Sequence, residues 1–542
     1  MLESRDICGV NIFRPRDKFE DFVYQYVKDN VFEKFDSGTY TERKKIVQIV
    51  NFEFQIYYDL INHNLDKIQP LHFSQFLFQE YENYGRVEEL FKAGRLSAAN
   101  EDFWQKYGGY ARRAIKHLLE LICIKGNFEK NIDHISIAEQ EKSISVMFIA
   151  AEEMISLYMR SHLYNAFYEE IELVLDESQF IYFDVKQDAE VRYDVRTIIR
   201  ESDRYIPSPS ILRNRQFHNA ILKDGFLETF GADYASILDG LQKLVIRLDD
   251  SQRDELDECR IISKNEAIDM LSIILSIENI QAESIIDGFS LTAQKMLDEG
   301  RELNRPKQQY RAYKRGFFLI SYKDLSYFIF SKRMALECLQ ILESEVAFKK
   351  LPPEWISKPI SKGLDVLNNQ AGRWFEKVVV KNLLDVGING VSSVKKLTFK
   401  NGKKIHVPPD VGEIDFLGLS KKNDIIIIVE IKQVGFATEP RMYMDDLDKF
   451  VTGKNNYSDK FERKFEWIKE NYLDVAKYLE EKLSCSTSVR KVAYVMITHY
   501  PTFIGPKINK FSCLSITEFM MQHHSDSGWN FSACSVPCLS KF

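Results

Sequence analysis

Gly412-Glu413-Ile414-Asp415-Phe416 and Asp424-Ile425-Ile426-Ile427-Ile428-Val429-Glu430-Ile431-Lys432 flank a short polar turn. The two segments predict strands at residues 414–419 and 425–432. An apolar run that does not alternate with polar residues is typical of a strand buried on both faces of a sheet. We therefore expect this hairpin at the centre of a mixed α/β sheet.

The same hairpin predicts which side chains meet. With the turn centred between residues 422 and 423, partners on the two strands have residue numbers that add up to 845. This register places Asp415 opposite Glu430 and Glu413 opposite Lys432. Opposed residues project from one face with Cβ atoms about 5 Å apart, and residues two apart on a strand share that face. Three carboxylates and one ammonium group are therefore expected at one end of the hairpin.

This group of charges fits a particular chemistry. Burying such charges costs several kcal/mol unless they are paired or bound to a metal ion. Carboxylate oxygens without nearby His or Cys favour Mg²⁺ or Mn²⁺ over Zn²⁺, and a lysine beside the metal can orient the attacking water. These residue types suit phosphodiester hydrolysis. The simpler interpretation is a Glu–Lys ion pair at an exposed hairpin end, and the flanking isoleucines argue against it.

Asp415 followed by Glu430-Ile431-Lys432 after a hydrophobic strand resembles the core motif of the PD-(D/E)XK nuclease superfamily, whose fold is restriction-endonuclease-like. The resemblance covers about residues 361–525. It implies that Asp415, Glu430 and the carbonyl of Ile431 bind the metal ion. It further implies that Lys432 is the catalytic lysine, and that hydrolysis leaves a 5′-phosphate and a 3′-hydroxyl.

Two acidic residues near the motif leave alternatives open, and a third extends it. Pro409-Asp410 matches the letters of the motif, but the register would pair Asp410 with residue 435, beyond the strand, so Asp415 is favoured. Glu413 is either a partner of Lys432 or a solvent-facing residue. Glu376, on the preceding predicted helix, takes by resemblance the place of an auxiliary acidic ligand.

The whole chain predicts a multidomain protein. Its 542 residues suit about three to four units of ordinary size. The signal before residue 350 is mostly helical, with one long helix expected at Val146–Leu175 and a short strand at Phe180–Val185. Paired prolines at 352 and 353 end the helical pattern and predict a domain boundary there. The expected parts are a mostly α-helical recognition or regulatory region at 1–352, an α/β nuclease-like domain with a mixed central sheet at 353–525, and a tail at 526–542.

Charge is unevenly distributed along the chain. The net charge is −7, yet residues 371–470 contain 18 Lys or Arg against 15 Asp or Glu, a net of +3, which leaves −10 for the rest. A positive segment around the hairpin has the right sign for contacts with phosphate groups. A second basic stretch interleaves tyrosines, which can stack on bases. The candidate nucleic-acid-binding residues are Lys395, Lys396, Arg441, Lys449, Arg311, Lys314 and Arg315.

Several other classes of function are disfavoured. The sequence lacks a phosphate-binding GxxxxGK[ST] loop, a GxSxG elbow and an HExxH helix. It has no signal-peptide core and no apolar run of roughly 18 residues, so we expect a cytoplasmic protein with no membrane partner.

We therefore expect a Mg²⁺- or Mn²⁺-dependent nuclease, with DNA favoured over RNA, and a further protein partner or an oligomer is compatible with it. By analogy of fold it resembles prokaryotic restriction and anti-phage effectors. The alternatives are an RNA-directed nuclease and a non-catalytic scaffold.

Overall fold

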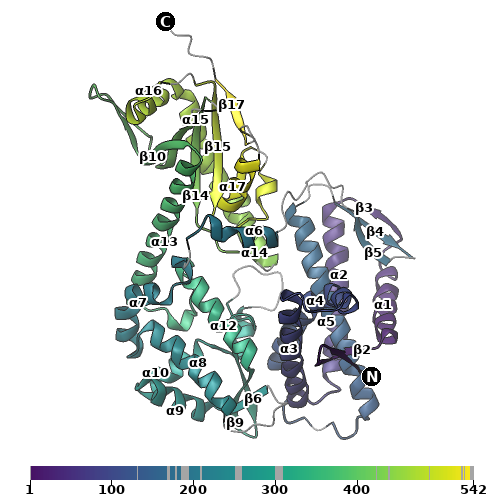
Figure 1. The fold of residues 1–542 in the computed structure, drawn as a ribbon. Coiled ribbons are helices and arrows are strands. Elements are labelled where there is room, and N and C mark those ends of the chain that lie inside the picture. The colour runs from purple at the N-terminus through teal and green to yellow at the C-terminus, as the bar shows by residue number, and fades with distance from the viewer. Residues whose placement is uncertain are drawn as a thin grey trace. The chain divides into compact units, whose positions relative to one another are not determined.

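The computed structural model describes residues 2–130, 132–167, 171–177, 180–184, 195–207, 210–250, 259–299, 309–420, 422, 424–437, 440–486, 489–508, 510–525, 529 and 531–536. The chain divides into two compact units (Figure 1). The N-terminal unit comprises Met1–Lys186 and Arg215–Leu364, and the C-terminal unit comprises Gln187–Asn214 and Asp365–Phe542. The division lies close to the expected boundary at residue 352, but the grouping of 187–214 with the C-terminal unit was not expected.

The N-terminal unit is mostly helical, as expected. Its helices are α1 (Asp17–Phe32), α2 (Arg43–Leu65), α3 (Pro70–Lys92), α4 (Ala98–Lys125), α5 (Ile137–Phe167), α7 (Arg215–Phe230), α8 (Tyr234–Asp250), α9 (Lys264–Leu275), α10 (Asn279–Asp287), α11 (Ala293–Glu299) and α12 (Lys332–Glu345). The prediction of one helix at Val146–Leu175 is wrong at its end. Leu173 and Leu175 alternate with half-buried residues in a strand, Glu172–Asp176, that pairs with both of its neighbours.

Small sheets accompany these helices. The strands are β1 (Leu2–Ile7), β2 (Val10–Pro15), β3 (Gly38–Tyr40), β4 (Glu172–Asp176), β5 (Phe180–Asp184), β6 (Cys259–Ser263), β7 (Ser290–Leu291), β8 (Phe317–Tyr322) and β9 (Leu325–Ser331). The strand expected at Phe180–Val185 is confirmed as β5. The last four strands form one sheet in the order β6-β9-β8-β7, and its core is rich in phenylalanine, with Phe317 touching the rings of Phe289 and Phe330.

Beside this sheet, α9 and α10 form a helix-turn-helix pair joined at residues 276–278. Such pairs place their second helix in the major groove when they bind DNA. Here the exposed positions of the second helix are the uncharged Asn279, Ile280 and Ser284, and the exposed acidic residues Glu266 and Asp269 lie on the first helix.

The C-terminal unit is an α/β structure. Its helices are α6 (Val195–Glu201), α13 (Lys358–Asp385, whose first turns belong to the N-terminal unit), α14 (Pro440–Leu447), α15 (Tyr457–Glu470), α16 (Tyr472–Leu483) and α17 (Ile516–Ser525). Its strands are β10 (Ile388–Val394), β11 (Lys396–Thr398), β12 (Lys404–His406), β13 (Ile414–Ser420), β14 (Ile425–Lys432), β15 (Lys491–Thr498), β16 (Ser512–Ser515) and β17 (Ala533–Ser535). The mixed sheet expected in this region is confirmed.

The strand order in this sheet is β10-β13-β14-β15-β16, and β17 pairs with β15. The pairs β10–β13 and β13–β14 are antiparallel, whereas β14–β15 and β15–β16 are parallel. The register of the central hairpin is the expected one, running from Phe416 opposite Val429 to Ser420 opposite Ile425. Since β17 lies within residues 526–542, that segment is not simply a tail.

Two helical layers cover this sheet. On one face Ile426 and Ile428 pack in a core with residues of α15 and α16, and on the other Ile425 and Ile427 pack in a core with residues of α13 and α17. Side chains alternate between the faces of a strand. Glu430 therefore continues the row that faces α15, and this alternation sets the position of the charged cluster described below.

In the described ranges, none of the helices combines the length and the apolar character needed to cross a membrane.

Candidate functional site

The charged residues of the hairpin lie where the ladder between β13 and β14 ends. Beyond the last ladder pair, Phe416 and Val429, the carboxylate of Asp415 replaces a main-chain acceptor. Its Oδ2 accepts a hydrogen bond of 2.8 Å from the main-chain N–H of Ile431. The side chain of Asp415 is thereby held beside Glu430, as the register predicts.

Four side chains meet at this point, and we call them the quartet: Asp415, Glu430, Lys432 and Lys464. The Nζ of Lys432 lies 2.6 Å from Glu430 Oε1 and 3.7 Å from Asp415 Oδ2. The Nζ of Lys464 lies 2.5 Å from Glu430 Oε2 and 3.8 Å from Asp415 Oδ1. Each carboxylate thus directs one oxygen to each lysine, and Glu430 is only 2% exposed.

Lys464 was not among the residues expected at the site. It lies on α15, in the buried stripe formed by Phe461, Phe465 and Ile468. The sequence does carry a signal for it, because a lysine at an otherwise apolar position of an amphipathic helix needs a buried partner. Only the tertiary structure identifies that partner as the pair of carboxylates on β13 and β14.

The charged groups of the quartet change one another's pKa values. Burial and the negative charge of Glu430 raise the pKa of Asp415 above its ordinary value. Burial acts to lower the pKa of Lys432, but Glu430 and Asp415 more than offset it and raise that pKa overall. Lys432 is therefore a protonated ammonium group at neutral pH, suited to donating hydrogen bonds and not to accepting a proton.

Glu376 and Glu413 lie near the quartet without belonging to it. Burial, followed by the negative charges of Asp415 and Glu413, raises the pKa of Glu376, which lies on α13. Glu413 pairs with Lys395 at 3.1 Å. Its pKa is lowered despite partial burial, through hydrogen bonds from Ser393 and Lys395. Of the alternatives left open by the sequence, neither a Lys432 partner nor a purely solvent-facing Glu413 is seen. The observed partner of Glu413 is Lys395.

Asp410, the alternative motif aspartate, lies apart from these groups. Its side chain is exposed, and its main-chain carbonyl accepts a hydrogen bond from Arg463 Nε at 3.2 Å. The geometry therefore brings Asp415, and not Asp410, together with Glu430 and Lys432.

The basic residues around the hairpin remain accessible. Lys395 and Lys396 lie at the start of the β11–β12 hairpin, and the side chain of Lys395 is 74% exposed. Lys449 follows α14 in a π-helical turn, with its Nζ 3.9 Å from Asp446 Oδ1. Arg441 lies in α14, and its side chain is outside the described part. Lys395, which pairs with Glu413, and Lys396 are both exposed to solvent, where a polyanion could reach them.

The second basic stretch has a different role. Arg311 Nε pairs with Glu120 at 2.8 Å. Arg315 is 1% exposed, donates a hydrogen bond to the carbonyl of Gly288 and pairs with Glu354 at 3.3 Å. Such buried pairs hold elements of the N-terminal unit together. The prediction that Arg311 and Arg315 contact nucleic acid does not agree with these positions.

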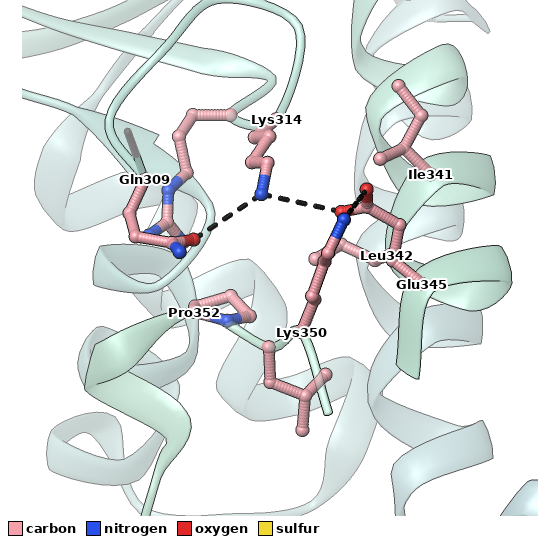
Figure 2. Close-up of a pocket in the computed structure, with 9 residues that line it drawn as sticks. Gln309, Lys314, Ile341, Leu342, Glu345, Lys350 and Pro352 are labelled. Carbon is pink, nitrogen blue, oxygen red and sulfur yellow. Dashed lines mark hydrogen bonds and ion pairs between the residues drawn. The ribbon is translucent and has the colours of Figure 1, made fainter. Parts of the chain in front are cut away.

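Lys314 completes this buried group. Figure 2 shows its ammonium between the side chains of Gln309 and Glu345, and Lys350 pairs with the other oxygen of the same carboxylate. The pocket that these residues line with Leu351 and Pro352 has a volume of about 10 Å³, room for roughly one water molecule. A phosphate group does not fit there, so Lys314 is also unsuited to the role predicted for it.

The donor set at the quartet fits a hard divalent cation. In the described part of the chain no three His, Cys, Asp or Glu side chains are grouped so that they could hold a metal ion, so an ion at the quartet would need further oxygen ligands, such as a main-chain carbonyl. The N–H of Ile431 points to Asp415, and the carbonyl of a strand residue points to the same side as its N–H. Asp415, Glu430 and this carbonyl together offer the oxygen ligands that Mg²⁺ and Mn²⁺ prefer.

Comparison of the chain with protein-family models, with curated proteins and with solved structures found no match. The geometry of the quartet and the topology that surrounds it are therefore the features that bear on function.

Proposed function

We propose that this chain is a metal-dependent nuclease that hydrolyses phosphodiester bonds, with DNA favoured over RNA. The observation that carries the proposal is the quartet at the ends of β13 and β14. Buried ion pairs add little stability compared with well-packed apolar residues, so a structural need alone is a weak reason for four charges here. They also lie at the carboxyl ends of the parallel strands β14 and β15, an edge where ligands bind in α/β sheets.

The topology supports the same proposal. The order α13, β10, β13, β14, α15 and α16, β15, with antiparallel strands followed by a parallel one, agrees with the resemblance to the PD-(D/E)XK superfamily. By the same resemblance, Glu376 on α13 would be the auxiliary acidic residue. The role as a prokaryotic restriction or anti-phage effector is an analogy of fold.

In this proposal Asp415, Glu430 and the carbonyl of Ile431 would hold Mg²⁺ or Mn²⁺. When bound, such an ion neutralises phosphate charge and lowers the pKa of a coordinated water. Burial acts to lower the pKa of Lys432, but Glu430 and Asp415 raise it overall, so Lys432 would act as an ammonium group. Its ammonium group would orient the attacking water through a hydrogen bond and stabilise the negative charge that develops on the phosphate oxygens.

A cleavage assay tests the proposal. Plasmid DNA, linear DNA, single-stranded DNA and total RNA are incubated with the full chain in Mg²⁺, Mn²⁺ or EDTA, in parallel with Lys432→Ala and Lys477→Ala. Lys477 is an exposed lysine of α16, so it controls for loss of one positive charge. We expect metal-dependent cleavage of DNA by the wild type and by Lys477→Ala, and none by Lys432→Ala.

The other outcomes separate the alternatives. Cleavage of RNA alone would show an RNA-directed nuclease. The quartet would contact only phosphate groups, so it does not by itself distinguish RNA from DNA. Binding of nucleic acid without cleavage, together with no binding of Mn²⁺ by calorimetry, would favour the non-catalytic scaffold.

A further inference from the structure

Lys464 occupies the position between the two carboxylates that a metal ion would need. Its Nζ faces Glu430 Oε2 at 2.5 Å and Asp415 Oδ1 at 3.8 Å. The side chain is only 8% exposed, so solvent does little to weaken these contacts. We propose that Lys464 is a built-in counterion of the site, which leaves the carboxylates when a divalent cation binds. This inference rests on the proposed function.

The charge balance of the quartet supports this. Two carboxylates face two ammonium groups, so the quartet carries no net charge without a metal ion. A divalent cation on the same oxygens would lie a few ångströms from both ammonium groups, in a buried position where like charges repel strongly. The metal ion and both ammonium groups cannot all remain in contact with the two carboxylates, so one lysine must move away from them.

The geometry favours Lys464 over Lys432 as the residue that withdraws. Lys432 lies on β14 itself, and its Nζ also lies 5.4 Å from the centre of the Tyr457 ring. Lys464 reaches the site from α15 through a long flexible side chain, which can turn away without moving β14. Glu413 offers another carboxylate with which Lys464 can interact after it leaves the site. Lys464 already contributes to lowering the pKa of Glu413.

Metal affinity gives the first test. Calorimetry with Mn²⁺ alone is performed on the full wild-type chain, on Lys464→Met, which keeps the length of the side chain without its charge, and on Lys460→Met. Lys460 is exposed on the same helix and serves as the matched control. We expect Lys464→Met to bind Mn²⁺ about ten-fold more tightly than the wild type, and Lys460→Met to bind it equally.

The direction in which Lys464→Met changes the affinity for Mn²⁺ decides between two roles of Lys464. If Lys464 instead orients the carboxylates for the metal ion, Lys464→Met would bind Mn²⁺ more weakly than the wild type, and the inference would be overturned. Circular dichroism of each protein establishes that the variants are folded before they are compared.

A second test uses the wild type and needs no variant. Lysines are acetylated with a water-soluble ester with and without saturating Mn²⁺, and the modified peptides are quantified by mass spectrometry. We expect Lys464 to be protected without metal and its labelling to rise about ten-fold with Mn²⁺, whereas Lys460 stays constant. Unchanged labelling of Lys464 in a chain that binds Mn²⁺ would refute the displacement, even if Lys464→Met fails to fold.

These results also distinguish the inference from the proposed function. If neither the wild type nor Lys464→Met binds Mn²⁺, the metal site fails and both proposals fall together. If the wild type binds Mn²⁺ and cleaves nucleic acid while Lys464 stays protected, the nuclease stands and only the displacement of Lys464 is wrong.

Discussion

Asp415 and Lys432 depend on each other for both charge and position, so each can be tested by a single substitution. We expect Asp415→Asn and Lys432→Ala to lower the rate of cleavage by about 10²-fold or more while the circular dichroism spectrum is kept. Asp410→Asn should remain within a few-fold of the wild type, because the Asp410 side chain is exposed and is not one of the four that meet in the quartet. An inactive Asp410→Asn beside an active Asp415→Asn would reverse the assignment of the motif aspartate.

The raised pKa of a second residue, Glu53, predicts how the stability of the protein depends on pH. Glu53 on α2 is 2% exposed, and burial raises its pKa to about 8 from an ordinary 4.5. Between these pH values the folded chain holds a proton that the unfolded chain has released, so stability falls as pH rises through the window.

Glutamine cannot release a proton in this pH range, so Glu53→Gln removes the contribution of Glu53 to the pH dependence of stability. We expect the variant to gain stability over the wild type, by several kcal/mol, at pH 8 and much less at pH 5, measured by urea unfolding. Glu139→Gln, at an exposed position of α5, is the control and should leave the difference between the two pH values unchanged. An equal gain for Glu53→Gln at both pH values would contradict the argument.

At the scale of the element, two glycines shape the sheet next to the site. Gly390 on β10 lies opposite Gly418 on β13, and the ring of Phe416 packs over both. An added Cβ would come within 2.5 Å of that ring at either glycine. The absence of side chains at these positions therefore makes room for Phe416, whose neighbour in the chain is Asp415.

A pair of alanine substitutions tests this packing. Gly418→Ala should destabilise the C-terminal unit by about 1–3 kcal/mol, because Phe416 has to move. Gly372→Ala, inside α13, should stabilise it by about 0.5–1 kcal/mol, since the added Cβ would meet only Gln433 Oε1 at an ordinary 3.8 Å. Thermal unfolding of the two variants should give melting-temperature shifts of opposite sign, and shifts of the same sign would show that the packing argument fails.

Elements with strong local patterns could be predicted from the sequence. The apolar run of β14 and the polar turn before it determine the hairpin, its register and the meeting of Asp415 with Glu430. Lys464 could not be placed in this way, because its partners lie more than thirty residues earlier in the chain. The roles expected for Arg311, Lys314 and Arg315 were wrong for a similar reason, since spacing along a chain does not reveal which cations find buried carboxylates.

At the scale of the whole molecule, the uneven charge predicts where a polyanion binds. The double variant Lys395→Ala/Lys396→Ala should weaken DNA binding and reduce the slope of log affinity against log salt by about 0.9 for each phosphate that is no longer neutralised. Lys18→Ala/Lys44→Ala, at exposed positions of the N-terminal unit, should change neither. Fluorescence anisotropy across a salt series measures both quantities, and equal effects of the two double variants would argue against a localised binding surface.

The C-terminal unit also draws on distant parts of the chain. Asn382 on α13 donates a hydrogen bond of 2.8 Å to the carbonyl of Tyr205, and Ala533 pairs with Ala493 in the sheet. During synthesis on the ribosome, β15 therefore gains this partner only after residues 533–535 have been made. Because β14 precedes β15 in the chain, β15 can pair with β14 first, and its pairing with β17 follows.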